Sequence, residues 1–129
     1  MKTRTLLYVA ALLTLGCKAK LSGDLTVDGK PFTAESCRSG QASGFSGVDL
    51  VDADGRKLRL VQIPNGTGAA ILFPPGATVG DEVGGCGPLS VSTQSSTINN
   101  IRNVEGSATL ECSNPKHSVK GAVTFENCH

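Results

Sequence analysis

The stretch SATLECSNPKHSVKGAVTF, residues 107–125, contains two short runs in which apolar and polar side chains alternate. A period of two is typical of half-buried β-strands. Between the runs stands Asn114-Pro115, a dipeptide that interrupts regular structure and favours a turn. We therefore expect the runs to pair as an antiparallel hairpin. The side chains expected on its inner face are Ala108, Leu110, Cys112, Val119, Val123 and Phe125, with Gly121 between them.

The same alternation recurs upstream, interrupted by Gly, Pro, Asp and Asn, and helical periodicity is absent after residue 16. Asp28-Gly29 fits a two-residue type I′ turn, because both residues tolerate a positive φ. Pro31 cannot donate to a ladder, so the strand after that turn is expected at a sheet edge. Residues 56–61 alternate as another strand. Seven or eight short strands predict an all-β domain over residues 23–129, a small antiparallel β-sandwich or, alternatively, a small β-barrel.

The first sixteen residues have a different pattern. Lys2 and Arg4 are followed by eleven uncharged residues, 5–15, and then by Gly16. A basic start, a short apolar run and a small residue are typical of a secretory signal peptide, which is helical in its apolar part. A membrane-spanning helix needs about 20 apolar residues, so residues 1–16 are predicted to be removed.

Cys17 follows directly, and Leu13-Thr14-Leu15-Gly16-Cys17 resembles the lipobox of bacterial lipoprotein precursors. The resemblance implies cleavage between Gly16 and Cys17, a diacylglyceryl group on the Cys17 thiol and an acyl chain on the new amino group. Residues 17–22 would then be the lipidated cysteine and a short linker. Lys18 stands where enterobacterial lipoproteins retained in the inner membrane carry aspartate, so the resemblance implies the outer membrane. The alternative is an ordinary secretory signal and a soluble secreted protein.

Four cysteines remain in an exported chain, and an even number predicts two disulfides. The 107–125 hairpin separates Cys112 from Cys128 by some nine residues of strand, roughly 30 Å, which is too far for a bridge. A strand beginning at Cys86 and antiparallel to 106–112 brings Cys86 beside Cys112. The favoured pairing is therefore Cys86–Cys112 with Cys37–Cys128.

Charge and composition argue against two classes of function, nucleic-acid binding and sugar binding. The chain has 12 basic and 11 acidic residues, and loss of Lys2 and Arg4 leaves ten basic ones. Such a balance gives no electrostatic footprint for nucleic acid. With no Trp and four Phe, the chain also offers few aromatic platforms for sugars.

No metal or cofactor is predicted. Cys112, His117, Cys128 and His129 have the spacing C-x4-H-x10-C-H, which does not match zinc sites, and both histidines are expected to be solvated. Asp52-Ala53-Asp54-Gly55 resembles part of a calcium loop, but Leu50 and Val61 occupy the first and twelfth ligand positions. A hairpin turn explains this motif better.

No catalytic set has a recognisable spacing, so an enzyme is not predicted. The polar stretch 95–103 offers a candidate hydrogen-bonding face made of Asn99, Asn100, Arg102 and Asn103. A long polar crossing between strands explains the same stretch better, and the binding face is the second interpretation. The expected function is a structural or protein-interaction module that contacts the membrane through its lipid and another envelope protein through its surface. A small-ligand-binding lipoprotein is the alternative.

Overall fold

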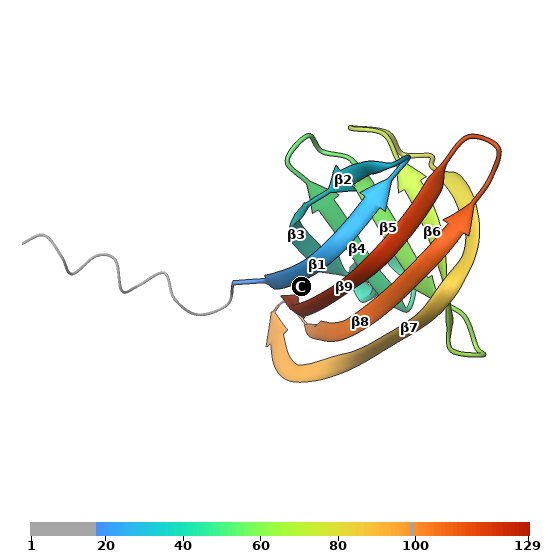
Figure 1. The fold of residues 1–129 in the computed structure, drawn as a ribbon. Helices are drawn as coiled ribbons and strands as arrows, with labels where there is room; N and C mark the ends of the chain where they lie inside the picture. Colours follow the sequence, from blue (N-terminus) through green and yellow to red (C-terminus); the bar gives the residue numbers. More distant parts are fainter. Residues whose placement is uncertain (1–17, 99) are drawn as a thin grey trace, which may run out of the picture.

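A computed structural model describes residues 18–98 and 100–129. They form one nine-stranded antiparallel sheet that curls into a nearly closed barrel (Figure 1). The all-β prediction is confirmed, and of the two architectures left open the chain has the barrel-like one. The sheet order is β2-β1-β9-β8-β7-β6-β5-β4-β3. The bounds are β1 Lys20–Val27, β2 Lys30–Phe32, β3 Ala34–Ser39, β4 Gly47–Asp52, β5 Lys57–Gln62, β6 Thr67–Phe73, β7 Asp81–Ile98, β8 Ile101–Ser113 and β9 Ser118–Cys128, with a 3-10 turn at Gly40–Ser43.

Successive strands run back and forth, except that β3 continues in the direction of β2, so the other connections alternate between the two ends of the barrel. The end where β1 begins and β9 finishes is called the proximal end, and it carries the β3–β4, β5–β6 and β7–β8 connections. The opposite, distal end carries the β1–β2, β4–β5, β6–β7 and β8–β9 connections (Figure 1). β1 begins at Lys20, so the strand extends into the range expected for the linker.

Two predicted hairpins are confirmed by their pairing. In β8 and β9, Cys112 lies opposite Val119 and the turn spans residues 114–117. Between β1 and β2, Asp28 and Gly29 have φ values of 56° and 79°, as a type I′ turn requires. β2, which contains Pro31, is an edge strand as predicted.

The core fills the barrel and follows the alternation of the strands. Leu50, Leu58 and Leu60 are fully buried at the centre of β4 and β5. The residues predicted to face inward from the last hairpin are also buried: Ala108, Leu110, Cys112, Val119, Val123 and Phe125. Burial of these side chains is the main driving force for closing the sheet.

The prediction of a polar crossing at 95–103 is wrong. β7 continues to Ile98 and β8 begins at Ile101, where the two residues lie opposite each other. Asn100, with a φ of 67°, occupies the turn. The strands are also longer than expected, since β7 has 18 residues and pairs first with β6 and then with β8. Polar side chains are compatible with these strand ends because the hydrogen bonds between β7 and β8 are made by the backbone, whatever the side chains are.

Both disulfides follow the predicted pairing. Cys86–Cys112 joins neighbouring strands β7 and β8, with a Cα–Cα distance of 4.5 Å. Cys37–Cys128 joins β3 to β9, which are not neighbours in the sheet, with a Cα–Cα distance of 5.0 Å. Two such bridges are typical of proteins that fold outside the cytoplasm.

The N-terminal predictions lie outside the described residues: the helical signal peptide, the cleavage site Gly16-Cys17 and lipidation of Cys17. In the part of the chain that the structure describes, no helix has the length and apolar character needed to cross a membrane.

Candidate functional site

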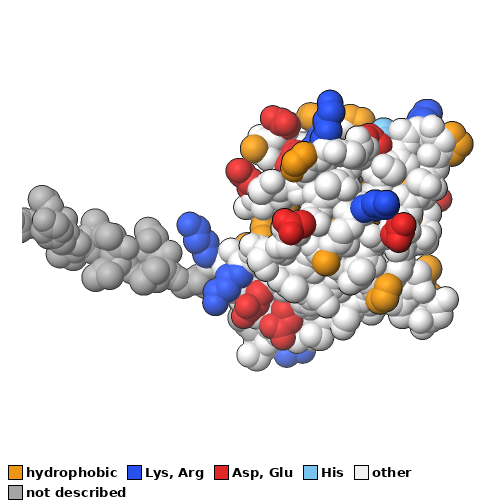
Figure 2. Space-filling view, in the orientation of Figure 1, with side chains coloured by type: hydrophobic (Ala, Val, Ile, Leu, Met, Phe, Trp, Pro, Cys, Tyr) orange, Lys and Arg blue, Asp and Glu red, His pale blue; other side chains and the backbone are white. Residues whose placement is uncertain are grey.

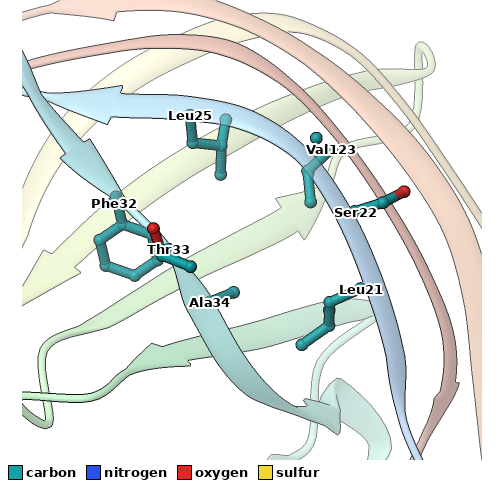
Figure 3. A pocket seen from close by; sticks show the side chains of 8 residues that line it. Leu21, Ser22, Leu25, Phe32, Thr33, Ala34 and Val123 are labelled. Atoms are coloured by element: carbon teal, nitrogen blue, oxygen red, sulfur yellow. The ribbon is translucent and has the colours of Figure 1, made fainter.

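The seam between the two sheet edges is closed at both of its ends. After β2 the chain passes through Thr33 and continues as β3 on the opposite edge, which closes the seam distally. The Cys37–Cys128 bridge closes it proximally. Between them, Leu21 and Leu25 of β1, Phe32 of β2 and Ala34 of β3 surround a gap of about 60 Å³ (Figure 3). Ligand pockets usually measure about 300–1,000 Å³, so this gap is a packing defect of the seam and no ligand site.

A second hollow, of about 400 Å³, lies between the β3–β4 connection and the strands β7 and β8. Its lining consists of uncharged residues, among them Phe45, Thr93 and Val104. It offers hydroxyl and amide groups but no charge to select a ligand.

The distal pocket has a volume of about 220 Å³ and combines apolar and charged groups. Its lining comes from all four distal connections and the adjoining strand ends: Asp28, Arg56, Leu72, Phe73, Pro74, Pro75, Asp81 and His117. Figure 2 shows acidic, basic and hydrophobic side chains close together along this end of the molecule.

His117 lies between two carboxylates. Its Nδ1 is 2.9 Å from Oδ2 of Asp28, and its Nε2 is 3.2 Å from Oδ2 of Asp81. A neutral imidazole carries one N–H, so only the protonated ring donates to both carboxylates. The hydrogen bond that the ring donates to Asp28, aided by the negative charges of Asp28 and Asp81, raises the pKa of His117. We call this arrangement of Asp28, His117 and Asp81 the His117 clamp.

The contact with His117 also changes the pKa of Asp28. The hydrogen bond from His117 and a second one from the backbone N–H of Ser118, at 2.9 Å, lower the pKa of Asp28. Through these contacts the clamp joins the β1–β2 turn, the start of β7 and the β8–β9 turn.

The Asn114-Pro115 turn fixes the position of His117. The Asn114 Oδ1 atom accepts hydrogen bonds from the backbone N–H groups of Lys116 and His117, at 2.8 and 2.6 Å. The Asn114 Nδ2 atom donates to the carbonyl of Glu82 at 2.8 Å, which attaches the turn to β7. An Asn side chain that satisfies the backbone after it is a common way to build such a turn.

The Asp52–Gly55 motif is a turn, as predicted. Asp52 Oδ1 accepts from the backbone N–H groups of Asp54 and Arg56, and Asp52 Oδ2 accepts from Arg56 Nε at 2.8 Å. The Arg56 guanidinium also lies over the ring of Phe32, 5.2 Å from its centroid. Arg56 is thus neutralised at the rim of the distal pocket. Among the described residues, no group of three His, Cys, Asp or Glu side chains is arranged to hold a metal ion.

A second ion pair lies on the outer face of β4 and β5. Arg59 donates from Nε and Nη2 to the two oxygens of Asp49, at 2.8 and 3.1 Å, and this contact raises the pKa of Arg59. The Asp49 side chain is only 5% exposed. The Arg59 guanidinium stacks between the rings of Phe45 and Phe73, at 4.5 and 5.1 Å from their centroids. This cluster is a structural feature of the barrel wall.

The predicted polar face is not formed as a unit. Asn100 and Arg102 are exposed at the proximal end, whereas Asn103 is only 3% exposed. Asn99 lies outside the described residues. Asn103 is buried because it lies within strand β8 of the long β7–β8 hairpin, where the sequence predicts a loop.

The His117 clamp was missed by sequence analysis, and the prediction that His117 is solvated is wrong. Its partners Asp28 and Asp81 are 89 and 36 residues away along the chain. The only local signals were the two turn motifs, Asp28-Gly29 and Asn114-Pro115, which the meander brings to the same end.

Among the described residues that line the distal pocket there is no serine, threonine or cysteine. Both nitrogens of His117 are occupied by carboxylates, so the ring has no free position for proton transfer. Comparison with known protein families, curated proteins and solved structures finds no match to this chain.

Proposed function

We propose that this chain is a bacterial envelope lipoprotein, cleaved between Gly16 and Cys17 and anchored in the outer membrane by lipid on Cys17. The basic start, the apolar run and the lipobox-like stretch 13–17 support this proposal. Two disulfides in the domain agree with folding in an oxidising compartment.

The beginning of β1 determines how such an anchor would orient the barrel. Three residues lead from Cys17 to Lys20, where β1 begins, and they reach about 10 Å when extended. The proximal end would therefore lie against the membrane, and the distal pocket would face away from it.

The role that fits this orientation is a structural or protein-interaction module without catalytic activity. The position of the distal pocket, on the end opposite the anchor, is the observation that carries this role. The pocket is smaller than the usual 300–1,000 Å³ of small-molecule sites, so a protein partner in the envelope is preferred to a free ligand. Its apolar floor keeps a small-ligand-binding lipoprotein as the second candidate.

Intact mass of the protein from its own membranes tests the anchor. We expect loss of residues 1–16, an added mass of acyl chains, and a gain of about four hydrogens on reduction of two bridges. Cys17→Ser should abolish the added mass. A wild-type chain without lipid would overturn the proposal and make this a soluble secreted β protein.

Sorting is tested with Lys18. In an enterobacterial host, Lys18→Asp should move the lipoprotein from outer-membrane to inner-membrane fractions on a density gradient. Lys20→Asp adds the same charge two residues later and should leave the distribution unchanged. If both variants or neither move, the assignment to the outer membrane is contradicted.

A further inference from the structure

The geometry points to the distal pocket as a docking site for a lysine side chain on the surface of a protein partner. The charge of the rim, the apolar floor and the free acceptor on Asp81 carry this inference. It goes beyond the proposed anchor and does not depend on it, since the pocket belongs to the barrel itself.

The charged groups around the pocket leave an excess of negative charge. Arg56 is paired with Asp52, which leaves Asp28 and Asp81 opposite the single charge of His117. The pocket then carries a net charge near −1 with His117 protonated and near −2 with His117 neutral. A cation is the complementary ligand in both states.

One acceptor of the His117 clamp is still available. Both oxygens of Asp28 are occupied, by His117 and by the Ser118 N–H. Asp81 uses only Oδ2, and within the described residues its Oδ1 has no hydrogen-bond partner. The Asp81 side chain is 45% exposed, so an ammonium group can reach it from solvent.

The floor fits the stem of a lysine. Leu72, Phe73, Pro74 and Pro75 line the pocket beside Asp81, and a four-carbon stem packs on such surface while its ammonium stays at the charged rim. Val79, in the same β6–β7 connection, is 79% exposed and offers an apolar contact for the residues around that lysine. Because Val79 lies two residues before Asp81 in the chain, a protein surface has an apolar contact there that a free amine does not use.

His117 competes with the incoming cation. While the ring is protonated, its Nε2–H donates to Asp81 and its charge repels an ammonium group. When the ring is neutral with the proton on Nδ1, the Nε2 lone pair faces Asp81, and a cation there is favoured. Lysine binding should therefore strengthen as the pH rises through the pKa of His117, which is raised in the clamp. The groups that face this ring are Asp28, Asp81 and, through Asp28, Arg56.

The test uses the protein as purified from the producing cell and N-acetyl-lysine-N-methylamide as the probe. NMR titration at pH 5 and pH 8.5 should shift the His117 ring and Ser118 amide signals, with at least three-fold tighter binding at the higher pH. N-acetyl-norleucine-N-methylamide has a similar stem without the charge and should bind at least five-fold more weakly. Equal binding of the two probes, or binding that weakens with rising pH, would overturn the inference.

Two matched variants locate the site. Asp81→Asn should weaken binding of the lysine probe at least five-fold, whereas Asp24→Asn, which removes an exposed carboxylate on β1, should change it less than two-fold. His117→Gln should remove the pH dependence and leave lysine binding at pH 5 as tight as wild-type binding at pH 8.5. Equal losses in the two Asp variants would contradict the site. If n-butylammonium binds as tightly as the capped lysine, the occupant is a free amine and the protein-partner part is wrong. Loss of lipid from the mature protein would contradict the anchor alone, because these titrations do not involve it.

Discussion

The barrel is closed by different means at its two ends. Proximally, the Cys37–Cys128 bond ties β3 to β9 across the seam. Distally, the chain itself crosses the seam at Thr33, and the His117 clamp ties the β1–β2 turn, the start of β7 and the β8–β9 turn through two hydrogen bonds to carboxylates. The covalent closure does not respond to pH, whereas the clamp depends on a proton. The proximal closure is therefore expected to contribute more to stability than the distal clamp, and the contribution of the clamp should change with pH.

The largest effect is expected from the seam disulfide. Replacing Cys37 and Cys128 together by serine opens a loop with a sequence separation of 91, and should lower the free energy of unfolding by about 4–5 kcal/mol. The Cys86/Cys112 double serine variant, with a separation of 26, should lose about 3–4 kcal/mol. Urea denaturation of both variants measures the difference. A larger loss for the second pair would contradict the special role of the seam.

An intermediate effect is expected in the barrel wall. Arg59→Met leaves the buried Asp49 with only Lys57, whose Nζ is 4.0 Å away, and should cost about 2–3 kcal/mol in urea denaturation. Arg38 lies opposite Asp49 on β3 but makes no ion pair within the described residues. Arg38→Met should therefore cost less than about 0.5 kcal/mol. Similar losses for the two variants would show that the Arg59–Asp49 ion pair adds nothing to the free energy of unfolding.

The smallest effect is expected at the His117 clamp, and it should depend on pH. Because folding raises the pKa of His117, its stabilisation is fully present below the ordinary value of about 6.5 and is lost as the pH rises through the raised value. His117→Gln should cost about 0.5–1 kcal/mol at pH 5 and much less at pH 9, as for a partly exposed ion pair. Lys116→Gln, at the neighbouring exposed position, should show no such difference between the two pH values. A loss for His117→Gln that is the same at both pH values would contradict the clamp.

Sequence analysis was accurate where the information is local. The alternation in 107–125 and the Asp28-Gly29 turn each specify a hairpin within a few residues, and the hairpin then determined which cysteines can meet. These predictions needed only strand period, turn chemistry and the reach of a disulfide.

The distal pocket and the burial of Asn103 could not be predicted in this way. Polar residues at 95–103 suggested a loop, because composition does not reveal that a backbone ladder continues through them. The His117 clamp depends on two turns and the start of β7, which meet only after the sheet has formed. Such a site is determined by the register of the whole sheet, so it cannot be predicted from a local sequence pattern.

The pairing of β1 with β9 has a consequence for timing. Residues 20–27 lie opposite residues 119–126, so the first strand has no long partner until the end of the chain has been made. At about 5–20 residues per second of synthesis, the first strand waits on the order of 5–20 s. During that interval β1 cannot pair with β9, and the barrel closes only when residues 119–126 are available. A large share of such distant contacts also predicts slow folding, on the scale of milliseconds to seconds after the last strand emerges.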